Sequence, residues 1–242
     1  MTDRESNTPA SDLKPMRFWA RGAEATTQKV FDYRALRFLL GIAALSVTWI
    51  VTFTANETLI SISSSYHTDA RDWFVGLLFF VGAFLWAYNG HYRWEGRLSK
   101  LAGVAAIVVA LVPGACRGCE QGLKAHIHLG ASTILFLVLA YFCLIPFRKN
   151  TKGKGGKKGL RSGIYLACGV AILGALGIAS ILTWTLCSAT VDEYRVVYWG
   201  EAVALHAFGI AWMTAGKVFP FLVDKDDSLP LWETEKAIHQ EK

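Results

Sequence analysis

Lysine and arginine are absent from six long apolar stretches of this 242-residue chain, at 38–53, 73–92, 101–115, 125–147, 164–186 and 196–216. With 53% hydrophobic residues, the chain is too apolar for an ordinary soluble domain. A membrane span needs about 20 apolar residues, and a basic side chain buried at its centre costs about 3 kcal/mol. The sequence therefore predicts an all-α polytopic membrane protein, a bundle of six transmembrane helices.

Three other features are missing. The first apolar stretch has no small-residue cleavage site at a suitable distance, so we expect an uncleaved first span rather than a signal peptide. The glycines of 149–161 (KNTKGKGGKKGLR) have no preceding strand and no G-K-[ST], which excludes a phosphate-binding loop there. No internal repeat is strong enough to indicate an inverted-repeat transporter.

The basic residues that are present alternate between the connections. Of 25 Lys and Arg, 21 lie in the N-terminal arm, the second and fourth connections and the C-terminal tail. Cytoplasmic loops retain basic residues, so we expect both termini in the cytoplasm. The same topology accounts for the net charge of +6, and the expected partners are membrane lipids rather than nucleic acid. We expect a multi-pass protein of a bacterial inner (plasma) membrane.

The predicted organisation has three parts. Residues 1–36 form a cytoplasmic arm with an interfacial amphipathic segment, and 37–216 form the six-helix domain, with a Gly/Lys-rich cytoplasmic loop at 149–161. Residues 217–242 form a cytoplasmic tail. Small residues favour close helix packing in the fifth stretch (Gly169, Gly174 and Gly177) and at Gly82 and Gly209.

Polar residues gather at the predicted extracytoplasmic end. They include Ser63, His67, Asp72, His126, His128 and Glu201. Glu201 lies inside an apolar run, and an ionisable group at that depth needs a polar partner or a water-filled cavity. The sequence predicts an integral membrane protein that contacts lipid and has a polar pocket on its extracytoplasmic side. These residues alone do not assign an activity to the pocket.

Several chemistries fit this pocket. A metal-dependent lipid hydrolase would use Ser63, His67, Asp72 and Glu201 as catalytic residues, and Ser63 or Ser64 would stabilise an oxyanion. Zinc is a possible cofactor, because imidazole and carboxylate groups are its usual ligands, and the candidates are His67, His126, His128 and Glu201. In a regular α-helix Ser63 and His67 share a face, whereas His126 and His128 point apart, so at most one of the latter belongs to the pocket. A haem ligated by His128 and His206 is a further alternative. Asp72 could also have a purely structural role, as a cap at the start of its helix.

Three cysteines lie on the predicted outer side, namely Cys116, Cys119 and Cys187. In an oxidising compartment, a disulfide between two of these three is the favoured interpretation. A redox-active C-x-x-C at Cys116 and Cys119 is the alternative, although such membrane proteins use a second pair and this chain offers only Cys187.

Three sequences carry a resemblance: SISSSYHTDARDWFVG, HIHLGAS and WGEAVALHAFGIAWMTAG. With the six spans, they resemble a diffuse class of bacterial six-span membrane proteins broadly similar to the FRAG–DRAM–SFK type. That resemblance implies a lipid-associated or regulatory membrane protein and supplies no catalytic residues.

A second resemblance is to the CREST superfamily of membrane hydrolases, whose Ser-x-x-x-His pattern matches Ser63 and His67, with Asp72 as its acid. It implies a zinc hydrolase. The chain departs from that family at the late His-x-x-x-His, because Ile210 stands four residues after His206, and in having six spans rather than seven.

Overall fold

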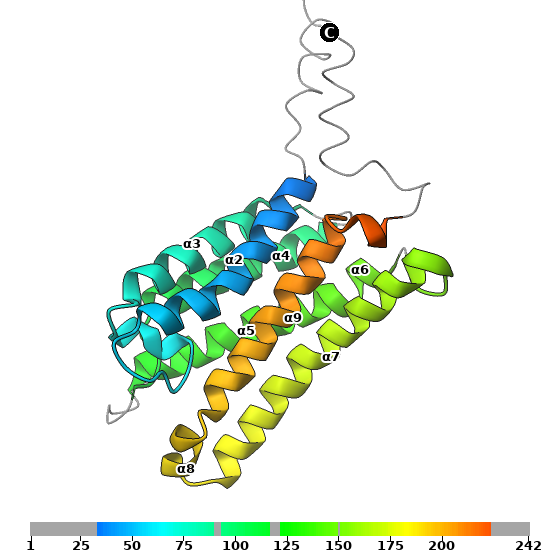
Figure 1. Ribbon diagram of the computed structural model, residues 1–242. Coiled ribbons are helices and arrows are strands. Elements are labelled where there is room, and N and C mark those ends of the chain that lie inside the picture. Colours follow the sequence, from blue (N-terminus) through cyan, green and yellow to red (C-terminus); the bar gives the residue numbers. More distant parts are fainter. Residues whose placement is uncertain (1–32, 90–92, 117–121, 150, 224–242) are drawn as a thin grey trace, which may run out of the picture. The chain divides into compact units, whose positions relative to one another are not determined.

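The computed structural model describes residues 33–89, 93–116, 122–149 and 151–223, and every regular element in these ranges is helical. Figure 1 shows the long helices, which are α2 (Tyr33–Thr54), α3 (Arg71–Ala87), α4 (Arg93–Leu111), α5 (Leu123–Leu144), α7 (Gly156–Thr185) and α9 (Val196–Ala215). The short helical turns are η1 (Ser63–His67), α6 (Pro146–Lys149), α8 (Ser188–Glu193) and η2 (Pro220–Leu222). The predicted all-α class is confirmed, and a long helix covers most of each predicted apolar stretch.

Four helical segments are long and apolar enough to cross a membrane, namely Ala35–Thr54, Leu123–Lys149, Gly156–Thr185 and Val196–Ala215. They indicate a membrane protein. The remaining two long helices differ from them: α3 has 17 residues, which span about 26 Å, and α4 begins with charged residues that include Arg93, Glu95 and Arg97. Residues of all six long helices share one hydrophobic core.

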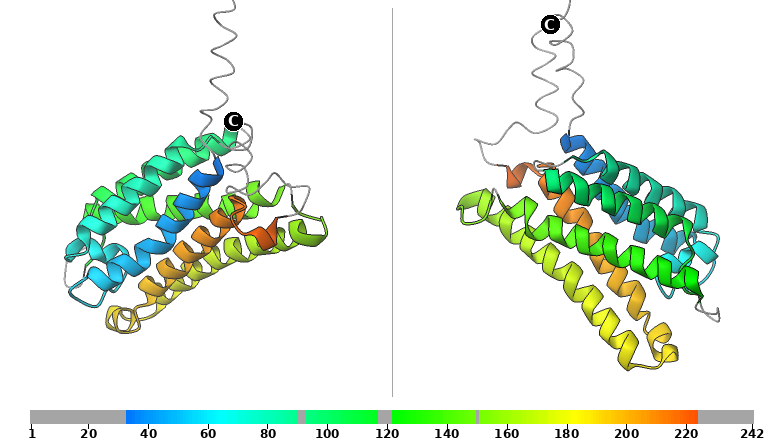
Figure 2. Two further views of the ribbon diagram at one scale, coloured as in Figure 1. Left: turned by 45° about the horizontal axis from the view of Figure 1, so that its top comes forward. Right: turned by 180° about the vertical axis from the view of Figure 1, so that it is seen from behind.

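The six long helices pack in a closed ring. Helix α2 packs on α3, α3 on α4, α4 on α5, α5 on α7, α7 on α9, and α9 returns to α2. Figure 2 shows α7 and α9 side by side from two further directions. Helices at the two ends of the described sequence therefore meet, and their contact places residues near 50 beside residues near 200.

Aromatic side chains fill the core at the end of the bundle where α9 finishes. Trp212 is fully buried, and its ring packs at centroid distances of 5.0–6.0 Å on Tyr88, Phe142, Phe147 and Phe208. Arg37 closes this end by donating to the Ala215 carbonyl and to the Tyr88 hydroxyl, each at 3.0 Å. A basic side chain thereby satisfies a free carbonyl group at the end of α9.

Two pairs of glycines let helix backbones touch. A Cβ built on Gly209 would lie 2.9 Å from the Gly41 carbonyl oxygen, and one on Gly41 would lie 2.8 Å from that of Gly209. Gly82 and Gly103 make the same reciprocal contact between α3 and α4, at 3.0 and 2.7 Å. These approaches exclude any larger residue without a shift of the helices.

The small residues of the fifth predicted stretch allow close packing at some positions only: a Cβ built on Gly200 would lie 2.9 Å from Ala179 Cβ and 3.3 Å from the Ala175 carbonyl oxygen. Gly169 does face a neighbour, the Leu144 side chain, but nothing lies within 4 Å of a Cβ built on Gly174 or Gly177. The prediction of close packing is therefore wrong for those two positions. Both glycines are exposed.

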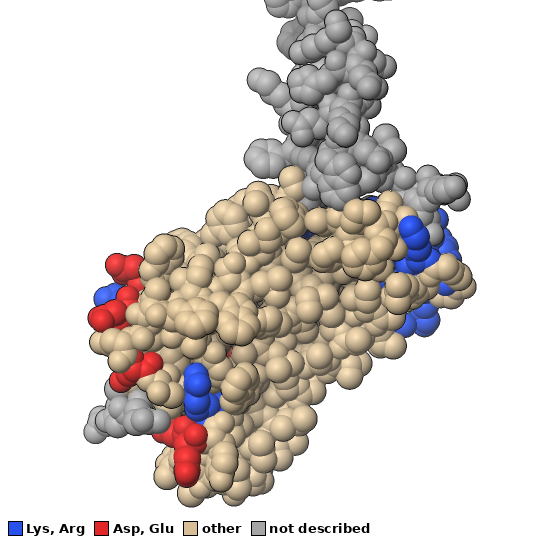
Figure 3. Space-filling view, viewed as in Figure 1, with Lys and Arg blue, Asp and Glu red and all other residues tan. Residues whose placement is uncertain are grey.

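Charge is divided between the two ends of the bundle (Figure 3). Exposed Lys152, Lys154 and Lys157 lie at the start of α7, whereas exposed Asp72 lies in the first turn of α3 and exposed Glu193 in α8. Figure 3 shows the acidic side chains gathered at one end, with some basic side chains among them. Helix α7 starts at Gly156, so the predicted loop 149–161 is shorter than expected. The first helix likewise starts at Tyr33, before the predicted boundary at 37. Residues 1–32 and 224–242 of the predicted arm and tail lie outside the described ranges.

Candidate functional site

The serine-rich segment before α3 is held together by its own hydroxyl groups. The Ser64 N–H donates to Ser61 Oγ at 2.9 Å, and Ser64 Oγ donates to the Ser61 carbonyl at 2.7 Å. Ser65 Oγ donates to the Ile62 carbonyl at 2.6 Å. All three serines are buried. Serine hydroxyls stabilise turns in this way, so the hydroxyls of Ser64 and Ser65 are engaged in the local fold.

Glu201 of α9 accepts hydrogen bonds from the residues at the start of η1. Its Oε2 accepts hydrogen bonds from the Ile62 N–H at 2.5 Å and the Ser63 N–H at 3.3 Å, and its Oε1 accepts one from Ser63 Oγ at 3.2 Å. The first N–H groups of a helix have no partner within it, and a carboxylate satisfies them well. The polar partner that Glu201 needs in its apolar run is thus the amino end of η1.

Two more contacts fasten the same loop to α9. Arg195 Nε donates to the Leu59 carbonyl at 2.7 Å, and the Tyr198 N–H donates to the Ile60 carbonyl at 3.0 Å. The Arg195 guanidinium also lies 3.8 Å from the centroid of the Tyr198 ring. Arg195 has a φ of 52°, a left-handed conformation rare for a residue with a side chain. Residues 59–63, named here the strap, are therefore bound along the start of α9.

His67 and His128 converge elsewhere, on the segment after α4. His67 Nε2 donates to the Gly114 carbonyl at 3.2 Å, and His128 Nδ1 donates to the Val112 carbonyl at 2.6 Å. A Cβ built on Gly114 would lie 3.2 Å from His128 Nε2, so this nitrogen faces the same glycine. His128 is only 5% exposed, and its Nε2 has no hydrogen-bond partner among the described residues. The two imidazoles lie at one backbone turn, apart from the contacts of Glu201.

The predicted polar pocket is thus divided. Ser63 joins Glu201 and His67 joins His128, because η1 is a 3-10 helix, in which residues four apart do not share a face. A regular α-helix, the condition under which Ser63 and His67 would share a face, is not formed here. Asp72 is exposed in the first turn of α3, and His126 is exposed with its Nδ1 3.2 Å from the carbonyl oxygen of Gly122.

A shared metal site is not formed by these groups. Across the described residues, no three His, Cys, Asp or Glu side chains are grouped so that they could hold one ion. The predicted zinc set of His67, His126, His128 and Glu201 is therefore not assembled, because His126 points to solvent and Glu201 binds the strap. The hydrolase set loses Asp72 for the same reason, since that carboxylate lies at the surface.

The outer cysteines are also distinguished. Cys116 is disulfide-bonded, whereas Cys187 is an exposed free thiol. Cys119 lies outside the described residues. Cys187 Sγ lies 3.0 Å from Thr190 Oγ1, and this hydrogen bond lowers the pKa of the Cys187 thiol. A pairing of Cys116 with Cys187 is excluded, which leaves Cys187 without the redox partner that the thiol/disulfide alternative needs.

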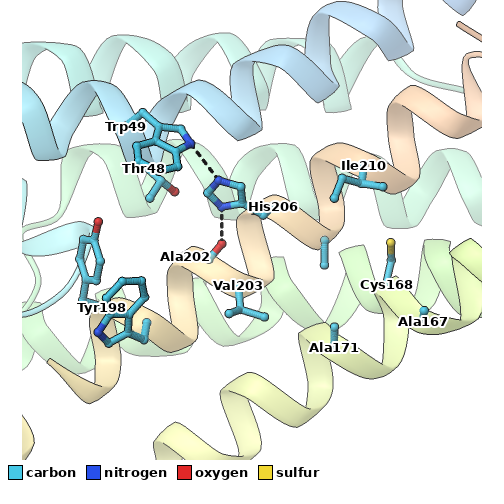
Figure 4. Close-up of a pocket in the computed structure, with 12 residues that line it drawn as sticks. Thr48, Trp49, Ala167, Cys168, Ala171, Tyr198, Ala202, Val203, His206 and Ile210 are labelled. Carbon is cyan, nitrogen blue, oxygen red and sulfur yellow. Dashed lines mark hydrogen bonds between the residues drawn. The ribbon is translucent and has the colours of Figure 1, made fainter. Parts of the chain in front are cut away.

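A groove of about 520 Å³ lies between α2, α7 and α9 (Figure 4). Its walls are mostly apolar, and four of its lining residues are alanines: Ala167, Ala171, Ala202 and Ala207. Small side chains at facing positions leave space that larger ones would fill. The volume falls in the range of about 300–1,000 Å³ typical of small-ligand sites.

His206 supplies the main polar group of this groove. Its Nδ1 donates to the Ala202 carbonyl at 2.7 Å, and its Nε2 accepts from Trp49 Nε1 at 3.0 Å, which requires a lone pair on Nε2 because an indole N–H can only donate. His206 is the eleventh residue of α9, about 15 Å along a helix about 30 Å long. Both nitrogens are engaged, which argues against the haem alternative with His128.

Three residues of these sites were not predicted from the sequence: Thr48 and Trp49 at the groove, and Arg195 at the strap. A tryptophan in an apolar stretch is typical of a residue at the membrane interface. Thr48 looks in the sequence like an ordinary polar residue beside it. The positive φ of Arg195 leaves no mark in the sequence. The groove could have been predicted only if the helix at 38–53 were known to pack on the helix at 196–216. No sequence pattern indicates that these two helices pack together.

Family models, curated proteins and solved structures were compared with this chain, and none of them matches it. The two resemblances therefore stay interpretations of short sequence motifs.

Proposed function

We propose that this protein is a lipid-binding multi-pass membrane protein that holds one lipid chain in the groove between α2, α7 and α9. The groove itself is the main support for this proposal. It is an apolar space of about 520 Å³, bounded by three helices that are each long and apolar enough to span a bilayer. In a membrane, such a space meets hydrocarbon chains rather than water. A lipid chain is the occupant that its chemistry and position favour.

The exposed surfaces beside the groove support this proposal. Trp199, Val203 and Ile210 line the groove and are 58%, 44% and 44% exposed. Apolar side chains with this exposure favour contact with lipid. The strap closes over the outer end of α9, where Tyr198 both lines the groove and bonds to Ile60. Glu201, His67 and His128 each bind backbone groups of neighbouring segments, which supports binding rather than hydrolysis.

Filling the groove tests this proposal. Ala171 lines it from α7, whereas the neighbouring Val170 does not and is 56% exposed. We expect Ala171→Phe to reduce retained lipid about tenfold, because the ring occupies the space of the chain. Native mass spectrometry of protein purified in mild detergent measures the retained lipid.

Val170→Phe is the matched control, since it adds the same ring one residue away, and it should retain lipid as the wild type does. Equal retention by the wild type and Ala171→Phe would contradict the proposal. Loss of lipid in both variants would point to a general effect of bulk on α7 and would count against the groove.

We also propose that all six long helices span the membrane with both termini in the cytoplasm, and a bacterial inner membrane stays our prediction for the compartment. Basic residues at one end of the bundle and acidic residues at the other support this orientation. Helix α3, although short, contains the uninterrupted apolar sequence WFVGLLFFVGAFLWA. The charged start of α4 would lie at the cytoplasmic surface, where Lys and Arg extend toward headgroups.

Cysteine labelling tests the orientation. We expect a membrane-impermeant maleimide to label Cys187 on intact cells without reduction, because this thiol is free, exposed and lowered in pKa. Cys116 should be labelled only after reduction, since it is disulfide-bonded. Cys187→Ser should remove the first signal and keep the second. Labelling of Cys187 only after cell lysis would reverse the orientation.

A further inference from the structure

The hydrogen bond between Trp49 and His206 crosses the groove wall from α2 to α9 (Figure 4). Apart from His206, the only described ring contact of Trp49 is with Phe53, at a centroid distance of 6.0 Å. Its side chain is 56% exposed. The exposed face of the indole leaves room for it to move, and the hydrogen bond to His206 is the polar contact that such a movement would break.

Thr48 is a residue of the same groove whose side chain has an unmet hydrogen-bonding need. It lines the groove next to Trp49 and is only 4% exposed. Its Oγ1 has no hydrogen-bond partner among the described residues. A buried hydroxyl without a partner costs about 1–3 kcal/mol in proteins generally, so a ligand hydroxyl that reached Thr48 Oγ1 would be stabilised there.

The groove presents no charge to a ligand. None of its lining residues is Lys, Arg, Asp or Glu, and His206 is neutral in this arrangement because its Nε2 accepts from the indole N–H of Trp49. His206 lies about 15 Å along α9, a depth at which an unpaired charged headgroup is strongly disfavoured. These facts exclude phosphate, ammonium and carboxylate groups from the position of the imidazole.

We infer that the ligand is a neutral long-chain lipid alcohol whose hydroxyl group inserts between Trp49 Nε1 and His206 Nε2. This inference rests on the proposed function and names the class of lipid. The hydroxyl oxygen accepts from the indole N–H, and the hydroxyl hydrogen is donated to the imidazole lone pair. Thr48 lies beside this position on the same helix.

Only a group that both accepts and donates can make this bridge. The present contact joins one donor and one acceptor at 3.0 Å, and two hydrogen bonds through an inserted oxygen need a separation of about 5 Å. An ether, ester or quinone oxygen accepts from Trp49 but leaves the His206 lone pair unpaired. The insertion replaces one hydrogen bond with two, which is the source of selectivity.

A pair of probes that differ in this group tests the inference: hexadecan-1-ol and its methyl ether, titrated into purified full-length protein and followed by native mass spectrometry. We expect the wild type to bind the alcohol about fivefold more tightly, the effect of one added hydrogen bond. His206→Phe should bind both probes equally, and should bind the ether at least as tightly as the wild type does, because no bond between Trp49 and His206 has to be broken. Trp49→Phe should keep a preference for the alcohol, since His206 Nε2 remains an acceptor.

Equal binding of the two probes by the wild type would overturn the inference while leaving the lipid groove in place. A preference for the alcohol that persists in His206→Phe would also overturn it. If neither probe binds the wild type and Ala171→Phe retains as much native lipid as the wild type, the proposed function fails as well. The Trp49→Phe result keeps the inference testable if His206→Phe does not fold.

Discussion

Gly209→Leu is expected to destabilise the bundle by about 3 kcal/mol or more, which corresponds to a fall of about 10 °C in the thermal midpoint. A Cβ on this residue would already lie 2.7 Å from Leu45 Cγ and 2.9 Å from the Gly41 carbonyl oxygen. A backbone atom cannot move aside as a flexible side chain can, so α2 and α9 must separate. The groove should widen with them.

Gly174→Leu is the matched control for this change. It makes the same substitution in a long helix, but nothing lies within 4 Å of a Cβ at Gly174. We expect its thermal midpoint to stay close to that of the wild type, because leucine is a better helix former than glycine and faces open space. Thermal unfolding in one detergent measures both variants. Equal midpoints for the two leucine variants would contradict the close contact of α2 with α9.

Glu201→Ala is expected to free the strap and to cost about 3 kcal/mol. It removes the acceptor for the Ile62 N–H, the Ser63 N–H and Ser63 Oγ, and Ile62 is only 2% exposed. Each buried donor left without a partner costs about 1–3 kcal/mol, reduced where water can reach it. Hydrogen exchange at the amides of Ile62 and Ser63 should become markedly faster, in addition to a lower thermal midpoint.

Two further variants separate the hydrogen bonds of Glu201 from its charge. Glu201→Gln keeps one carbonyl oxygen that can accept from the strap, so its loss of stability should fall between those of the wild type and Glu201→Ala. Glu193→Ala removes an exposed carboxylate from α8 and should change neither the midpoint nor the exchange of Ile62. Unaltered exchange of Ile62 in Glu201→Ala would show that the carboxylate does not hold the strap.

The sequence predicted the helices well because their signal is local. Each apolar stretch is long and free of Lys and Arg, and membrane burial leaves a helix as the available structure. The sequence also predicted that Glu201 has a polar partner, because a carboxylate inside an apolar run needs a hydrogen-bonding group or water beside it. The partner proved to be the N–H groups of Ile62 and Ser63. It could not be predicted, because every residue except proline has a backbone N–H and the sequence does not mark which of them binds.

The remaining features depend on which helices meet. Trp49 and His206 are 157 residues apart and bond only because α2 closes the ring against α9. The same closure decides which glycines pack: Gly209 meets Gly41, whereas Gly174 faces outward although its sequence context has as many small residues. The 3-10 geometry of η1, which sends Ser63 and His67 to different partners, arises from serine hydroxyls that close the turn.

Photo-crosslinking with a diazirine-bearing fatty acid, incorporated into membrane lipids before purification, tests the lipid groove most directly. Peptide mapping of the crosslinks should find them concentrated on groove residues such as Ala167, Ala171 and Ile210. Crosslinks spread evenly over exposed apolar residues outside the groove, such as Phe79, Leu101 and Leu137, would show that lipid merely surrounds the bundle and that no chain is held between α2, α7 and α9.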